Sequence, residues 1–162
     1  MNARRCLAAL LLFQSCAVLA QPLDDDELAG LAARPSIGLY KAYAEFKMAH
    51  YDSARSIWQA LAEKGVAEAW FHLGILAEDG LGEVRDGRAA VERYRRGAQA
   101  GSTKAQYRLG LLYLEGGPVE PDREQARYWL AVAAANGDDE AARQRLLGKA
   151  RTLRQLAGEH AP

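Results

Sequence analysis

The chain has 162 residues, of which 49% are hydrophobic and 26% charged, a composition typical of one globular domain. It carries 21 lysines and arginines against 21 aspartates and glutamates, so its formal net charge is zero. A nucleic-acid-binding protein needs a strongly basic face, and this balance argues against one.

Residues 1–20 have the features of a secretory signal peptide. Arg4 and Arg5 give a positive start, a mainly apolar stretch follows, and Ala20 is a small residue suited to a cleavage site. We therefore expect cleavage after Ala20 and export to the periplasm. The apolar stretch is shorter than the roughly 20 residues that a transmembrane helix needs, so no membrane span is expected.

Both cysteines, Cys6 and Cys16, lie in this leader, so the mature chain is expected to have no disulfide. The residues before Cys16 also resemble a lipoprotein processing site, which would tether the protein to a membrane. Phe13 and Gln14 fit that site poorly, and the apolar stretch continues beyond Cys16. Ordinary cleavage is therefore favoured, and lipidation at Cys16 remains the alternative.

Residues 21–35 form an acidic N-terminal segment that includes the run Asp24-Asp25-Asp26-Glu27. A calcium-binding loop requires alternating oxygen ligands and a glycine, and the run has neither. We therefore interpret it as a solvated acidic segment without a metal.

Two blocks of 36 residues, 66–101 and 102–137, repeat one another. Several identities recur at this offset, and they are Ala69 and Ala105, Leu73-Gly74 and Leu109-Gly110, Gly80 and Gly116, Asp86 and Asp122, Ala90 and Ala126, Ala98 and Ala134, and Gly101 and Gly137. A fixed period of this length is typical of stacked helical repeats.

Each block predicts two helices joined by a turn. Small or apolar residues spaced by four, such as Ala69, Leu73 and Ala77, indicate a helix face. The turn between the two helices is predicted at Gly80 and Gly82 and at Gly116 and Gly117. The second helices are predicted to be capped by Asp86 and Asp122. The glycines that end second helices are Gly65, Gly101 and Gly137. Gln125, three residues after Asp122, predicts a capping box.

The flanks of the two blocks also have helical patterns. Residues 36–65 lack the glycine turn and are predicted to be a degenerate repeat of the tetratricopeptide kind, with Tyr51-Asp52-Ser53-Ala54 opening its second helix. Residues 138–162 are predicted to form a C-terminal capping helix and tail, with Ala142, Leu146 and Leu153 on one face.

These residues resemble the Sel-1-like repeat, a relative of the tetratricopeptide repeat. Residues 102–137 carry the motif best, with Pro118 as a departure, while residues 66–101 depart at Ala77, Glu83 and Gly97. The resemblance implies an all-α fold, a short right-handed α-solenoid of helix-turn-helix repeats closed by the capping helix.

The sequence offers no recognisable catalytic or metal-binding motif. His50, His72 and His160 are scattered without a partner at ligand spacing, and Gly80-x-Gly82 lacks the preceding strand and third glycine of a phosphate-binding loop. The basic cluster Arg93, Arg95 and Arg96 is predicted to be a solvated helix face. Some relatives have been credited with acting on penicillins, but those are cysteine-rich. We therefore expect no enzyme, cofactor or metal.

Function is instead expected at the concave side of the solenoid, where first helices of successive repeats line a groove. The predicted groove residues are Glu68, Phe71, Ile75, Glu78, Lys104, Tyr107, Leu111 and Leu114. The leading hypothesis is a periplasmic protein–protein interaction module, an adaptor or regulator that binds an envelope assembly component. An immunity protein that neutralises a secreted effector is the alternative, and a hydrolase of β-lactams or cell wall has least support.

Overall fold

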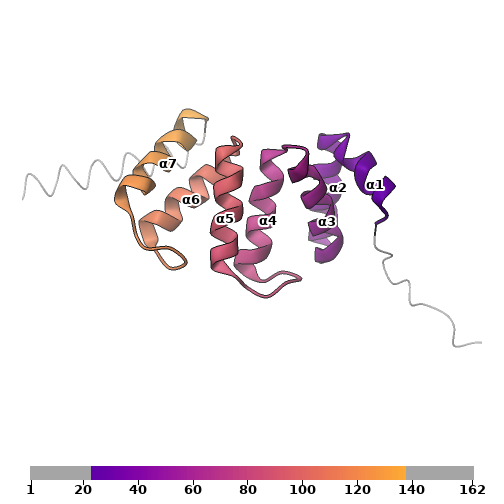
Figure 1. Ribbon diagram of the computed structural model, residues 1–162, viewed down its shortest axis with the longest axis horizontal. Helices are drawn as coiled ribbons and strands as arrows, with labels where there is room; N and C mark the ends of the chain where they lie inside the picture. Colours follow the sequence, from indigo (N-terminus) through magenta and orange to yellow (C-terminus); the bar gives the residue numbers. More distant parts are fainter. Residues whose placement is uncertain (1–22, 138–162) are drawn as a thin grey trace, which may run out of the picture.

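The structure, a computed structural model, describes residues 23–137, and within them the chain forms seven α-helices in a row (Figure 1). They are α1 (Asp25–Ala32), α2 (Pro35–Lys47), α3 (Tyr51–Glu63), α4 (Ala67–Asp79), α5 (Gly87–Gln99), α6 (Thr103–Glu115) and α7 (Arg123–Ala135). The predicted all-α class is confirmed. The predicted signal peptide and capping helix lie outside the described residues.

The helices pack sequentially as pairs. α2 packs on α3, α4 on α5, and α6 on α7, while α3 contacts α4 and α5 contacts α6, which joins each pair to the next. We call the first helix of each pair (α2, α4, α6) an A helix and the second (α3, α5, α7) a B helix. The A helices α4 and α6 also contact one another directly.

The helix caps and helix-ending glycines predicted for the repeats are present. The carboxylate of Asp86 accepts hydrogen bonds from the backbone N–H groups of Arg88 and Ala89, at 2.9 and 3.0 Å, and Asp122 caps α7 in the same way. The glycines that end the B helices, Gly65, Gly101 and Gly137, have φ values of 83°, 99° and 91°. These left-handed conformations turn the chain out of each B helix.

The capping box predicted at Gln125 is wrong. That motif needs the backbone N–H of Asp122 to be free for the glutamine side chain. Instead this N–H donates to the carbonyl of Tyr113 at 2.8 Å, and in the preceding repeat the N–H of Asp86 donates to the carbonyl of Ala77 at 2.8 Å. The loops that follow α4 and α6 are therefore each closed by a hydrogen bond back to the end of the preceding helix.

Glycines also set how closely the paired helices approach. A Cβ atom on Gly74 would lie 2.4 Å from Cε1 of Tyr94, and one on Gly110 would lie 2.8 Å from Cγ of Leu130. Only glycine fits at these two equivalent positions, because the B helix packs directly on the A-helix backbone.

The acidic segment 21–35, to which the sequence analysis gave no helix, contains α1. Asp24 accepts the N–H of Glu27 at 2.7 Å, and the acids in the first turn match the positive end of the helix dipole. Leu31 and Ala32 are buried, because α1 packs on α2 and α3. The acidic run is therefore the start of a short helix that covers the first pair.

The core is built in two main parts. The first lies among α1 to α4 and includes the fully buried Trp58, Ile57 and Leu61. The second lies among α4 to α7 around Tyr94 and Leu109. Each part spans consecutive pairs, so the pairs are not independent units.

The end of α2 is strained at one residue. Ala49 has a φ of 63° and is the only residue other than glycine with positive φ in the described part of the chain. The N–H of His50 donates to the carbonyl of Glu45 at 2.9 Å, which is the closing bond of a Schellman motif with Ala49 where glycine is preferred.

Ala49→Gly is therefore expected to raise the unfolding free energy by roughly 0.5–1 kcal/mol, because glycine adopts positive φ without a Cβ penalty. Thermal unfolding followed by circular dichroism would show a melting temperature higher by about 2–5 °C. The matched control is Gly65→Ala. Its φ is 83° and its Cβ would touch nothing within 4 Å, so it should lose a similar amount. An unchanged or lower stability of Ala49→Gly would contradict the assignment.

Candidate protein-interaction surface

The predicted groove residues all lie on the A helices α4 and α6, as expected from the repeat. We call the solvent-facing sides of the three A helices the A-helix surface. It comprises Ile37, Tyr40, Tyr43, Glu68, Phe71, His72, Ile75, Glu78, Lys104, Tyr107, Arg108, Leu111 and Leu114.

Glu68 and Lys104, which are equivalent positions in successive repeats, form an ion pair across α4 and α6. The Lys104 Nζ lies 2.5 Å from Glu68 Oε1, and the same ammonium group sits 5.8 Å above the centre of the Phe71 ring. The hydroxyl of Ser102 donates to the other Glu68 oxygen at 3.1 Å. Glu68 therefore links two repeats, and its charge is largely neutralised within the molecule.

Glu78 holds a second link between α4, α5 and α6. It accepts hydrogen bonds from the Tyr94 hydroxyl at 2.6 Å and from Arg108, whose Nε lies 3.1 Å away. Burial raises the pKa of Glu78, but the hydrogen bonds from Arg108 and Tyr94 outweigh burial and hold it below its ordinary value. Burial, together with Glu78, raises the pKa of Tyr94. Glu78 is therefore an ionised structural anchor.

The apolar groove residues are mostly packing residues. Phe71 and Ile75 are half-buried against the second core part, and Tyr107 and Leu111 against the small cluster of Leu130 and Ala133. Leu114 is the most exposed of the predicted apolar groove residues, at 46%. The structure thus places the eight predicted residues on one surface but ties most of them into the fold.

His72, which sequence reasoning left out of the groove, lies at the centre of an aromatic cluster. Its ring stacks on Trp58 at 4.6 Å with an interplanar angle of 8°, and the rings of Phe71 and Tyr43 lie 5.3 and 6.3 Å away. Burial lowers the pKa of His72 to about 4, with Glu68 opposing and Lys104 adding to this shift. His72 is therefore neutral near pH 7.

The expectation that the histidines have no carboxylate partner is wrong for two of them. His72 Nε2 lies 3.9 Å from Glu68, and His50 Nδ1 lies 2.8 Å from Glu45. Both carboxylates are four or five residues away in sequence, and the helix or its C-terminal turn brings them close. Within residues 23–137, no three side chains of the metal-ligating types gather as a metal site would require.

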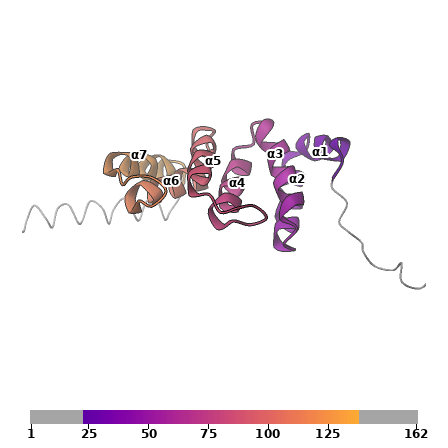
Figure 2. The same ribbon diagram turned by 60° about the horizontal axis from the view of Figure 1, so that its bottom comes forward.

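The apolar residues most exposed on the A-helix surface belong to α2 and were missed by the sequence analysis. Tyr40, Ile37 and Tyr43 are 77%, 50% and 48% exposed. Their spacing of three residues along a helix was the available signal, but α2 lies outside the two clear repeats that define the predicted groove. α2 lies at the lower edge of the molecule in the view of Figure 2, with no other helix drawn below it.

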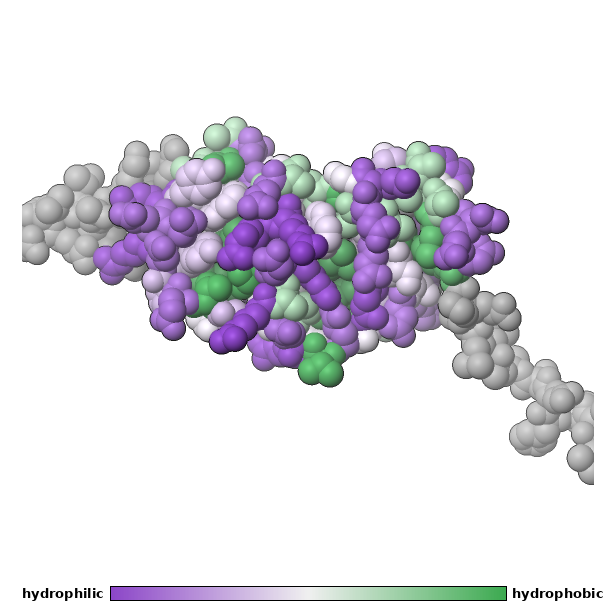
Figure 3. Space-filling model, viewed as in Figure 1, coloured by the Kyte–Doolittle hydropathy of each residue, from purple (hydrophilic) through white to green (hydrophobic). Residues whose placement is uncertain are grey.

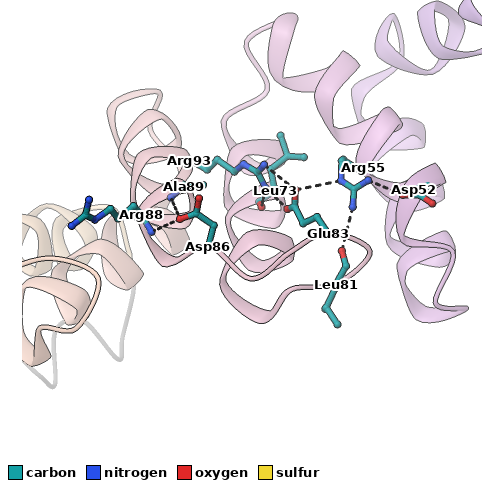
Figure 4. A network of polar contacts seen from close by, with 9 residues as sticks. All are labelled: Asp52, Arg55, Leu73, Leu81, Glu83, Asp86, Arg88, Ala89 and Arg93. Carbon is teal, nitrogen blue, oxygen red and sulfur yellow. Dashed lines mark hydrogen bonds and ion pairs between the residues drawn. The ribbon is translucent and has the colours of Figure 1, made fainter.

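The side of the molecule with α3 and α5 carries a polar network instead (Figure 4). Glu83 binds Arg93 through two contacts of 2.5 and 3.2 Å and lies 3.8 Å from Arg55. Arg93 also donates to the carbonyl of Leu73 at 2.8 Å, and Arg55 to that of Leu81 at 3.3 Å. The three side chains hold the loop of the second repeat against two B helices.

The basic cluster of α5 is therefore not simply a solvated face. Arg93 belongs to the Glu83 network, Arg95 donates to the hydroxyl of Tyr113 at 3.1 Å, and Arg96 lies over the ring of Trp70 at 5.1 Å. Polar side chains dominate the face of the molecule in Figure 3, with apolar residues showing between them. In residues 23–137, no helix is both long and apolar enough to cross a membrane.

Comparison with known proteins agrees with this architecture. The Sel1 repeat family matches residues 67–102 and 103–138, within one residue of the blocks predicted from the sequence. No curated protein matches the chain.

Two solved structures are similar to the chain. One is a Sel1 repeat protein from Oxalobacter formigenes, with 33% identity, a TM-score of 0.62, and coverage of 66% of this chain and 45% of that one. The other is a protective antigen of uropathogenic Escherichia coli strains that displays an SLR fold, with 28% identity, a TM-score of 0.59, and coverage of 74% of this chain and 28% of that one. The chain spans less than half the length of either protein.

Proposed function

The chain belongs to the Sel1 repeat family, and we propose that it is a periplasmic module that binds another protein through its A-helix surface. Sel1 repeats are in general protein-interaction modules, and this supports the class of function. The observation that carries the proposal is the exposure of large apolar side chains on A helices, namely Tyr40 at 77%, Ile37 at 50% and Leu114 at 46%. Exposed apolar residues on a repeat surface are typical of a protein-binding face.

Two finer roles fit this proposal. An adaptor or regulator would bind an envelope assembly component, and an immunity protein would bind a secreted toxic effector. Export through residues 1–20 is part of both proposals and is supported by the charged start and the apolar stretch. An intact mass that begins after Ala20 would support export, and one that begins with a lipidated Cys16 would move the protein to a membrane.

The test is affinity capture from a periplasmic extract with the full mature chain as bait. A variant with Leu114→Glu places a charge in the surface without touching the ion pairs of Glu68 or Glu78. We expect it to reduce capture at least about tenfold, because a buried anchor of an interface is lost. The matched control is Tyr128→Glu on the B helix α7, where Tyr128 is 58% exposed, and it should capture normally.

The identity of the captured protein separates the finer roles. A secreted lipase, nuclease or wall hydrolase made by the same operon would favour the immunity role, and an envelope component or sensor the adaptor role. Equal capture by the wild type and Leu114→Glu would move the interface away from α6. Turnover of nitrocefin or peptidoglycan by the purified chain would overturn the non-catalytic proposal.

A further inference from the structure

The face of α2 turned away from the core carries an apolar stripe that no other helix of residues 23–137 covers. Ile37, Tyr40 and Tyr43 are spaced by three residues, so they follow one side of the helix over about 9 Å. We call these three residues the α2 stripe. Met48, just past the end of the helix, is also exposed, at 55%. The remaining exposed large apolar residues of the described chain, Val84, Leu114 and Tyr128, stand singly on other elements.

The α2 stripe is not the side of the helix that packs on the core. The opposite side of α2 is already packed, because Gly38 and Ala42 are buried against α1 and α3, and a Cβ on Gly38 would lie 2.8 Å from the carbonyl oxygen of Leu31. Tyr43 is held in place by the rings of Phe46 and His72, each 6.3 Å away. An aromatic side chain that is already oriented loses little conformational entropy when a partner binds it.

On α2 itself, the exposed charge beside the stripe is positive. The only acid of α2, Glu45, is buried and accepts hydrogen bonds from Lys41 at 2.6 Å and His50 at 2.8 Å. Lys47 is exposed and has no carboxylate partner among residues 23–137. Glu27 of α1 also acts on Lys41, so the uncompensated cation of α2 is Lys47, at the end of the stripe.

We propose that the α2 stripe is the docking surface for an amphipathic helix of a partner protein that carries acidic residues beside its apolar face. This inference rests on the proposed protein-binding function and names the part of the A-helix surface that recognises the partner. Side chains spaced by three along a helix form a ridge that packs into the groove of a second helix. An acidic residue of the partner helix complements Lys47, and the tyrosine hydroxyl groups stay at the wet edge of the contact.

The experiment measures binding of two labelled synthetic peptides to the full mature chain by fluorescence anisotropy. Both peptides have about four helical turns with leucines along one face, and one has glutamates and the other lysines on the opposite face. The acidic peptide is expected to bind at least about tenfold more tightly than the basic one. Higher salt should weaken this preference, because exposed charges are screened.

Three variants locate the binding site. Tyr40→Ser removes a ring that is 77% exposed and should weaken binding of the acidic peptide at least about tenfold. Lys47→Glu should weaken binding of the acidic peptide by roughly three- to tenfold and abolish the preference for the acidic over the basic peptide. The control Tyr128→Ser should bind like the wild type, and circular dichroism of each variant should be unchanged.

The results separate this inference from the proposed function. Failure of the acidic peptide to bind, or binding that ignores Tyr40 and Lys47, overturns the assignment to α2 even if capture of a partner through Leu114 succeeds. Self-association of the wild type that Tyr40→Ser abolishes would make a second copy the occupant and would also overturn it. Loss of all protein capture, including capture that depends on Leu114, would instead remove the proposed function.

Discussion

Trp58→Ala is expected to lower the free energy of unfolding by about 3–5 kcal/mol, because it opens a large void in the part of the core that lies among α1 to α4. The Trp58 side chain is fully buried. Its ring packs on Phe46 of α2 at 5.7 Å and on His72 of α4 at 4.6 Å, so one side chain of α3 connects two successive A helices. Its buried Nε1 has no hydrogen-bond partner among residues 23–137, which places the loss toward the lower end of that range.

Urea unfolding followed by far-ultraviolet circular dichroism measures this loss. Trp58→Phe keeps a ring against His72 and should lose less than half as much, because the remaining void is smaller. Val84→Ala, at a loop residue that is 89% exposed, is the control and should change stability by no more than about 0.5 kcal/mol. A loss below about 1 kcal/mol for Trp58→Ala would show that this cluster does not hold the first two pairs together.

The stability of the protein is also expected to fall by about 2 kcal/mol between pH 7 and pH 5 because of His72. Burial lowers the pKa of His72 to about 4 in the folded chain, whereas an unfolded histidine has a pKa near 6.5. The unfolded chain therefore takes up a proton at a pH where the folded chain does not. The stabilisation is fully present above about pH 6.5 and is lost progressively as the pH falls toward 4.

Urea unfolding at a series of pH values tests this expectation. His72→Phe keeps an aromatic ring against Trp58 but cannot be protonated, so its stability should be nearly constant from pH 7 to pH 5. The lowered pKa values of Glu45 and Glu78 matter only at lower pH, because their stabilisation is present above about pH 4.5 and is lost below it. If the free energy of unfolding of His72→Phe still falls between pH 7 and pH 5, the pH dependence belongs to another group.

The polar network at Glu83 shows how the same fold uses different chemistry in successive repeats. The residues found 36 positions after Arg55, Glu83 and Arg93 are Val91, Val119 and Trp129, respectively. The later three residues belong to the second part of the core, where they pack as apolar side chains. The departure of Glu83 from the repeat motif is therefore compensated by two arginines, each at a position that is apolar one repeat later.

The sequence by itself determined the class of fold and the position of its turns. The helical spacing of residues such as Ala69 and Leu73 and the caps at Asp86 and Asp122 act over a few residues. The 36-residue period shows that the same local pattern occurs twice. Hydrogen bonds within one helix or one turn depend only on neighbours in the chain, so they can be read from local patterns. The glycines of the turns, Gly65 and Gly101 among them, belong to the same local class.

Only the tertiary structure decided which surface residues are available. Glu68 and Lys104 are 36 residues apart, and Glu78 and Arg108 are 30 apart, so their pairing depends on how α4 and α6 lie beside one another. Periodicity places a residue on a helix face, but the partner that neutralises or covers it comes from another element. For this reason the predicted groove charges are internal links, while Tyr40 of α2 remains open to solvent.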